Sequence, residues 1–126
     1  MKMQPDIIDT QSISGYGPGW IGIGSEKIHS SVVIGSRGER FDWGCSRFED
    51  LSVQHFAQLA ALNTELIIFG SGRRIRFPPG ALIRPLIDKR IGIETMDTEA
   101  ACRTYNILAG EGRWVAVALL IESALA

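Results

Sequence analysis

The sequence predicts an α/β domain of three layers. A mixed central sheet carries parallel β–α–β units in the C-terminal two-thirds, and the N-terminal third adds an antiparallel β layer. Helical and strand patterns alternate between residues 50 and 121, an order that builds a parallel sheet covered by helices. The run Leu66–Phe69 is apolar throughout, as in a strand buried on both faces. The first third combines glycine-rich turns with the β-favouring run Val32–Ile34.

Length and composition place the chain among ordinary globular domains. Its 126 residues suit a single domain spanning residues 1–126, with residues 1–11 as a loosely ordered arm. Hydrophobic residues make up 45% of the chain and charged residues 21%, so a core can form without cross-links. The net charge of -1 argues against broad binding to nucleic acid.

The hydropathy pattern predicts no membrane span. The longest apolar run, Trp114–Ile121, has the length of a strand, and Pro5 and Asp6 interrupt any basic-then-apolar leader. Cys45 and Cys102 have no close spacing, so they predict neither a metal motif nor a redox motif. Together these features predict a reduced, cytoplasmic protein.

The glycine-rich segment Ser12–Gly24 contains the spacing G-x-G-x-x-G at Gly17, Gly19 and Gly22. A dinucleotide-binding fingerprint requires an apolar strand before these glycines and a helix after them. Neither flank fits, because Lys27–Ile34 has a strand pattern. We therefore predict a turn between short strands rather than a nucleotide site.

The next elements are a hairpin, a helix and a central strand. Lys27–Ile34 and Glu39–Trp43 flank a glycine-containing turn and predict an antiparallel pair. Asp50–Asn63 predicts a helix capped by Asp50 or Ser52. Its expected apolar face consists of Val53, Phe56, Leu59 and Ala60. Thr64–Phe69 is the predicted central strand.

The last third continues the alternation. After an extended piece at Ile75–Phe77, an apolar stripe predicts a short helix that ends near Arg90. Pro85 means that this helix either begins near Arg84 or has a distorted first turn. A strand at Ile91–Met96 follows. The remaining predictions are a helix capped by Asp97 or Thr98 that runs to about Ala109, and a final strand at Arg113–Ile121.

Parallel strands predict where a site would lie. Right-handed crossovers place the ends of the strands at Phe69, Met96 and Ile121 along one edge, and ligands of such sheets bind beyond the carboxyl ends. Backbone amides there and an arginine could hold an anion. The alternative is that the glycines only form a tight turn and that the arginines are solvated. The candidate ligand-binding or anion-binding residues are Gly70, Ser71, Gly72, Arg73, Asp97, Thr98, Arg103 and Asn106.

The residues that usually carry catalysis are poorly arranged. No Gly-Lys-Ser/Thr follows the Gly70–Gly72 turn, so the phosphate-loop pattern is absent. Cys45 and His55 form a nucleophile–base pair only if the fold brings them together with an orienting group. His29 and His55 are far apart and lack clustered carboxylates, which makes a poor metal set. We therefore predict no catalytic residue, no metal site and no cofactor.

Several motifs of the second half occur together in one known family. They are Gly-Ser-Gly-Arg-Arg at 70–74, Arg-Phe-Pro-Pro at 76–79, Gly-Ile-Glu-Thr-Met-Asp-Thr at 92–98, Ala-Ala-Cys-Arg-Thr-Tyr-Asn-Ile-Leu at 100–108 and Glu-Gly-Arg at 111–113. From about Gly15 to Ile121 the chain resembles the uncharacterised-domain family that includes the adipogenesis-associated Mth-domain protein and mitochondrial complex I assembly factor three. The family usually carries Gly-Thr-Gly where this chain has Gly70-Ser71-Gly72, which keeps a hydroxyl.

The resemblance implies a three-layer α/β domain with an added small β layer and implies no established reaction. Its mitochondrial members look like protein-binding assembly factors. We therefore expect a non-enzymatic protein-binding or assembly-factor-like module with a protein partner. The alternative is a small-molecule or anion-binding domain, with or without catalysis, whose pocket lies at the Gly70–Gly72 turn.

Overall fold

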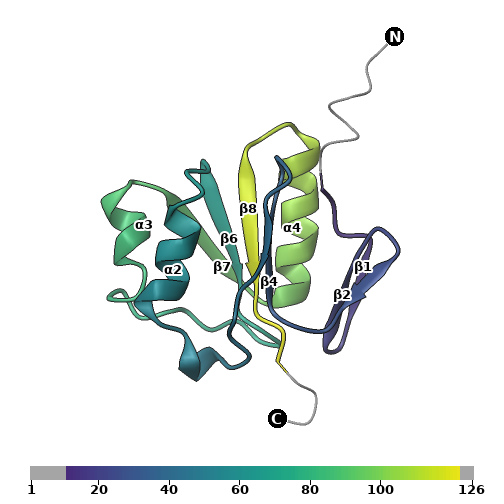
Figure 1. The fold of residues 1–126 in the computed structure, drawn as a ribbon, viewed down its shortest axis with the longest axis horizontal. Helices are drawn as coiled ribbons and strands as arrows, with labels where there is room; N and C mark the ends of the chain where they lie inside the picture. Colours follow the sequence, from purple (N-terminus) through teal and green to yellow (C-terminus); the bar gives the residue numbers. More distant parts are fainter. Residues whose placement is uncertain (1–10, 123–126) are drawn as a thin grey trace.

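The computed structural model describes residues 11–122 (Figure 1). Within this range the chain forms two sheets, three α-helices and one short 3₁₀ helix. The arm predicted over residues 1–11 lies outside the described residues, apart from Gln11. Gln11 is anchored, because its side-chain amide donates hydrogen bonds to the carbonyl oxygens of Gly35 and Glu39 at 3.1 and 2.7 Å.

The central sheet is mixed, as the sequence predicts, with the strand order β5-β4-β8-β6-β7. β6 (Leu66–Gly70) lies between β7 (Gly92–Met96) and β8 (Val115–Leu119) and pairs with both in parallel. β4 (Val32–Gly35) and β5 (Arg40–Asp42) add the antiparallel part.

The register of the parallel strands fixes the edge where a site was expected. Gly70 lies opposite Met96 on one side and opposite Leu119 on the other. The prediction that three strands end along one edge is therefore confirmed. Residues distant in the chain become neighbours there, because the chain leaves all three strands at the same edge of the sheet.

Helices cover both faces of the central sheet (Figure 1). α4 (Thr98–Gly110) packs on one face, and α2 (Val53–Ala60) and α3 (Arg84–Asp88) pack together on the other. Successive side chains of β8 point to opposite faces of the sheet, which matches this arrangement. Val115, Val117 and Leu119 pack in the core under α4, and Ala116 and Ala118 pack in the core under α2 and α3.

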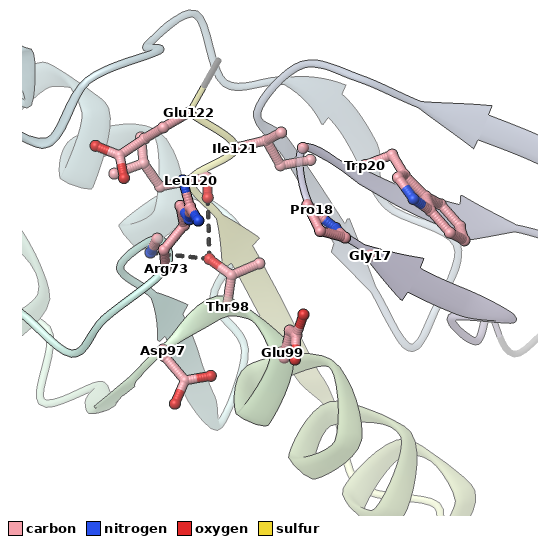
Figure 2. A pocket seen from close by; sticks show the side chains of 12 residues that line it. Gly17, Pro18, Trp20, Arg73, Asp97, Thr98, Glu99, Leu120, Ile121 and Glu122 are labelled. Carbon is pink, nitrogen blue, oxygen red and sulfur yellow. Dashed lines mark hydrogen bonds between the residues drawn. The ribbon is translucent and has the colours of Figure 1, made fainter. Parts of the chain in front are cut away.

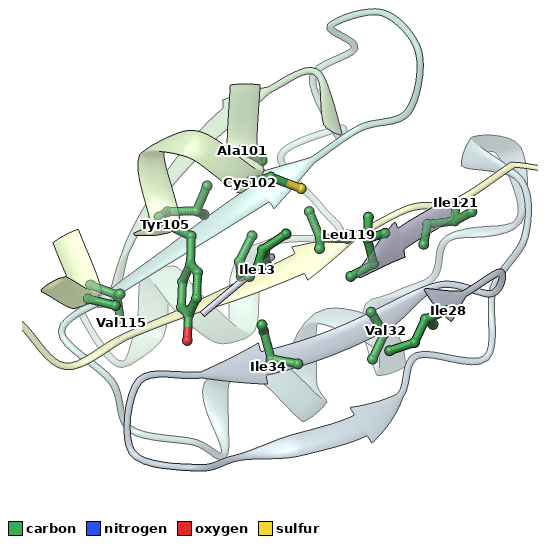
Figure 3. Packing of buried hydrophobic residues seen from close by; sticks show 14 residues of the cluster. Ile13, Ile28, Val32, Ile34, Ala101, Cys102, Tyr105, Val115, Leu119 and Ile121 are labelled. Carbon is green, nitrogen blue, oxygen red and sulfur yellow. The ribbon is translucent and has the colours of Figure 1, made fainter. Parts of the chain in front are cut away.

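A small second sheet completes the core on the α4 side. β1 (Gly15–Gly17), β2 (Trp20–Ile23) and β3 (Glu26–Ile28) pair antiparallel in this order. Figure 3 shows Ile13 and Ile28 packed with Tyr105 and Leu119 in one apolar cluster. The antiparallel N-terminal layer is thus present, and it positions the Gly17–Trp20 turn near the start of α4 (Figure 2).

The predicted strand Lys27–Ile34 is divided between the two sheets. Its first part is β3, which pairs with β2, and its last part is β4, which pairs with β5 and β8. Ser31 lies at the change of sheet and is buried. Its hydroxyl accepts a hydrogen bond from the amide of Ile121 at 2.8 Å, and this bond satisfies a polar group inside the core.

The helices differ from the predictions mainly at their ends. The predicted helix Asp50–Asn63 is shorter, because the 3₁₀ helix η1 (Phe48–Asp50) precedes α2 and Ser52 is the N-cap. Val53 was assigned to the buried stripe but is 41% exposed. α3 begins at Arg84, which confirms the first of the two alternatives for Pro85. α4 begins at Thr98 with Asp97 as its cap.

Candidate functional site

A cleft of about 350 Å³ opens at the carboxyl edge of the sheet (Figure 2). It lies between the start of α4, the turn after β6, the end of β8 and the Gly17–Trp20 turn of the small sheet. Four of the predicted site residues line it, namely Gly72, Arg73, Asp97 and Thr98. The predicted location of a site therefore coincides with a real concavity.

The turn after β6 is hydrogen-bonded to its own chain. The Ser71 amide donates to the carbonyl oxygen of Met96, and the Gly72 amide donates to the Thr98 hydroxyl, both at 2.9 Å. The Thr98 amide in turn donates to the Gly72 carbonyl at 2.8 Å. Backbone amides that donate within the chain cannot also hold an anion, so these three are not free for a ligand.

Thr98 joins three elements at this point. Its hydroxyl accepts from Gly72 and donates to the carbonyl oxygen of Leu120 at 2.9 Å, as the dashed lines in Figure 2 show. The hydroxyl therefore connects the end of β6, the start of α4 and the residue after β8.

Gly70 is required by close packing. A Cβ atom at this position would lie 3.0 Å from both the Cβ of Ala101 and the Cα of Thr98. Gly72 has a φ of +108°, a backbone conformation that side chains disfavour. Both glycines are thus explained by packing and backbone conformation. This agrees with the alternative stated for the sequence, in which the glycines only form a tight turn.

Ser71 is fully buried and closes the loop that follows. Its hydroxyl donates to the carbonyl oxygen of Arg74 and accepts from the amide of Arg76, both at 2.8 Å. The Arg76 guanidinium donates to the Ser71 carbonyl and forms an ion pair with Glu122 at 2.6 Å. It also lies over the Phe48 ring, 4.8 Å from the centroid. Arg76 and Glu122 were not among the predicted residues, although they hold this loop in place.

Arg103 and Asn106 lie on α4 but do not line the cleft. Arg103 donates to the Tyr16 hydroxyl at 2.8 Å, and this bond raises the pKa of the guanidinium. The Asn106 side chain both accepts from and donates to the backbone of Ile13, each at 2.8 Å. These two side chains attach the small sheet and the segment before it to α4, and neither of them lines the cleft with Gly72, Arg73, Asp97 and Thr98.

The glycine-rich segment forms one wall of the cleft. The sequence pattern did not place this segment at the site. Gly17, Pro18, Gly19 and Trp20 line it opposite Thr98. The signal was present as a glycine-rich turn, but only the packing of the small sheet beside α4 places that turn at the carboxyl edge. The Trp20 ring is covered on one side by the Lys27 ammonium at 4.3 Å.

The charges lining the cleft are mostly negative. Asp97, Glu99 and Glu122 line it together with a single arginine, Arg73. Asp97 accepts a hydrogen bond from the Ala100 amide as the cap of α4, and Glu122 is paired with Arg76. This balance favours a cationic or neutral guest over an anion.

The two thiols are protonated, and His55 has a structural contact. Burial raises the pKa of Cys102 to about 12 and raises the pKa of Cys45, so both stay protonated at neutral pH. The Nδ1 atom of His55 accepts the Ser52 amide at 3.0 Å and so takes part in capping α2. Across residues 11–122, no three His, Cys, Asp or Glu side chains are grouped as they would be around a metal ion. Over the same range, no helix is long and apolar enough to cross a membrane.

The comparisons with known proteins place the chain in a family. Residues 13–120 match the model described as "Protein of unknown function (DUF498/DUF598)". The chain belongs to the DUF498/DUF598 family. Within this family it is similar to an uncharacterised protein of Rhodobacter capsulatus, at 33% identity over 93% of this chain and 90% of that protein. A crystal structure from Bordetella parapertussis matches with a TM-score of 0.84 and 35% identity, over 90% of this chain and 97% of that one.

The family resemblance found in the sequence is thereby confirmed. A Drosophila melanogaster relative named NADH dehydrogenase [ubiquinone] 1 alpha subcomplex assembly factor 3 is 32% identical over 62% of this chain. The match covers 42% of the Drosophila protein, and another curated relative is matched over 58% of its length. The chain thus spans about half the length of these relatives.

Proposed function

We propose that this DUF498/DUF598 chain is a non-enzymatic protein-binding module of the assembly-factor kind. The observation that carries the proposal is the state of the turn after β6, where the amides expected to hold a ligand bind Met96 and Thr98 instead. Relatives named as assembly factors support a role in binding protein. The two free, buried thiols suit a reducing compartment, so we place this role in the cytoplasm.

A second candidate function rests on the cleft itself. A concavity of about 350 Å³ at the carboxyl ends of parallel strands is a frequent place for a small ligand. Arg73 is the cleft residue that remains to contact an acidic group, while Asp97 and Glu99 would contact a basic one. In this alternative the guest is a small molecule that carries a positive charge, with Trp20 as one wall.

One experiment tests the protein-binding proposal directly. The chain carrying an affinity tag at low, native-like expression is purified from its own cells, and the eluate is weighed by native mass spectrometry. We expect a complex with a second protein in a fixed ratio. Elution of the chain alone in repeated purifications, with and without chemical crosslinking, contradicts the proposal.

The cleft alternative has its own measurement. A library of small cationic and anionic metabolites is screened by thermal shift against the wild type and against Arg73→Ala and Glu99→Gln, two substitutions at exposed side chains. A guest of the cleft raises the melting temperature of the wild type and loses this effect in one of the two variants. A shift of equal size in all three proteins shows binding elsewhere.

A further inference from the structure

We propose that the loop of residues 73–79, called here the basic loop, docks on an acidic and partly apolar surface of a partner protein. Arg73, Arg74, Ile75 and Phe77 are the contact residues. The proposal rests on the protein-binding function above and adds which face binds and what chemistry the partner presents.

The basic loop lies in a stretch without negative charge. Between Glu65 and Asp88 the chain has no aspartate or glutamate, while it has arginines at 73, 74, 76 and 84. The chain as a whole has a net charge of -1, so this stretch is positive along the sequence and not part of a generally basic protein, although Arg73 also lines the cleft together with Asp97 and Glu99. A carboxylate-bearing surface is its electrostatic complement.

Two large apolar side chains project from the same loop. Phe77 is 70% exposed, more than any other large hydrophobic side chain in the described part of the chain, and Ile75 is 50% exposed. Single exposed apolar residues are ordinary, but Ile75 directly follows two exposed arginines and Phe77 lies only two residues further on. Aromatic side chains and arginine are the residue types enriched in the buried centres of protein interfaces.

Arg76 holds the loop in this shape before any partner arrives. Its guanidinium donates to the Ser71 carbonyl, pairs with Glu122 and lies over the Phe48 ring. Its neighbours on either side, Ile75 and Phe77, are left facing solvent. A loop that is already ordered loses less conformational freedom on binding, and this increases affinity without additional contacts.

The charges available to a partner are those of Arg73 and Arg74. Arg76 is neutralised by Glu122, whereas both preceding arginines are exposed. Within residues 11–122 neither has a carboxylate oxygen within 4.0 Å. Their planar guanidinium groups suit the paired oxygens of aspartate and glutamate side chains.

A protein surface fits this loop better than a lipid surface. Even a myristoyl chain binds bilayers only marginally, and the tips of Ile75 and Phe77 bury less apolar area than such a chain. A protein partner adds contact area around the loop, which a standard interface of about 800 Å² per side requires. The observations therefore favour an acidic, partly apolar protein surface.

The test begins with a photo-crosslinker. Benzoyl-phenylalanine replaces Phe77 or, as a matched control, Ile107, which is 61% exposed on α4. After irradiation in cells, we expect a crosslinked partner from position 77 and not from position 107. Mass spectrometry of the crosslinked peptide identifies the contact point, which we expect to lie beside aspartate or glutamate residues.

Binding of the purified partner then measures the contribution of the loop. We expect Phe77→Ser and the double variant Arg73→Glu/Arg74→Glu each to raise Kd at least about tenfold, as removal of an interface anchor does. Replacement of the partner's crosslinked acidic residue by lysine reverses its charge and should restore binding to the double variant. Ile107→Ser and Arg90→Glu are the matched controls and should leave Kd unchanged. Circular dichroism confirms folding, which these exposed positions should not affect.

Three results would overturn the proposal in different ways. If a partner binds but Kd is the same for all loop variants, the docking face is wrong and the protein-binding function stands. If no partner is recovered from position 77, from position 107 or by purification, the protein-binding function fails as well. If the wild type sediments with phosphatidylglycerol vesicles and Phe77→Ser does not, the surface that the loop meets is a membrane.

Discussion

Replacement of Thr98 by valine should destabilise the fold through two orphaned backbone groups. Valine keeps the shape of threonine but removes the hydroxyl that accepts from the Gly72 amide and donates to the Leu120 carbonyl, both at 2.9 Å. Gly72 and Leu120 are buried, so solvent replaces these bonds poorly. At about 1 kcal/mol for each unsatisfied group, the lower end of the usual range, the expected loss is about 2 kcal/mol.

Urea unfolding and thermal melting measure this loss. For a domain of this size, 1 kcal/mol corresponds to about 4 °C, so Thr98→Val should lower Tm by about 8 °C. Thr98→Ser is the control, because it keeps the hydroxyl and removes only a methyl group, and it should cost less than about 1 kcal/mol. Equal stability of the valine and serine variants would refute the role assigned to the hydroxyl.

Four further changes test other contacts. Gly70→Ala should lower the free energy of unfolding by about 1–3 kcal/mol in urea melts, because its Cβ would lie 3.0 Å from the backbone of α4; unchanged stability would contradict that close approach. Arg76→Met should lower the free energy of unfolding by about 1–2 kcal/mol, because it leaves the half-buried Glu122 unpaired. The double variant Arg76→Met/Glu122→Gln should recover part of this loss. A double variant no more stable than the single one would refute the pairing. Asn106→Ala should speed amide hydrogen exchange in residues 12–17, because it removes two hydrogen bonds of 2.8 Å to the backbone of Ile13. Mass spectrometry measures this exchange. Unchanged exchange would show that other contacts anchor the segment. Burial raises the pKa of Cys102 to about 12, so the unfolded chain loses this proton first as pH rises. The contribution of Cys102 to the free energy of unfolding should therefore hold steady below about pH 8.5 and fall by up to about 1.4 kcal/mol per pH unit above it. The measured slope above about pH 8.5 should be shallower in Cys102→Ala, and equal slopes would contradict this.

Local sequence patterns predicted the framework well because the framework depends on local physics. The apolar run of β6 and the Asp97 cap of α4 each depend on residues a few positions apart. The common edge of the three strands followed from the handedness of crossovers, which holds for any chain with this alternation. These elements could therefore be placed without knowledge of distant contacts.

The partners of polar side chains could not be predicted in the same way. Asn106 was predicted to contact a ligand, yet it binds the backbone of Ile13, 93 residues away in sequence. Arg76 was one of three arginines between β6 and Phe77, and its contact with Glu122, 46 residues further on, distinguishes it. Such pairings depend on how the two sheets pack, which no short window of sequence contains.

The amide of Gly72 decides most directly whether the turn after β6 binds its own chain or a ligand. Hydrogen exchange at this amide can be followed by NMR, with and without inorganic phosphate. The bond to the Thr98 hydroxyl predicts slow exchange that phosphate does not change. Exchange as fast as in an open chain, or protection that appears only with phosphate, would contradict the structural role of the turn.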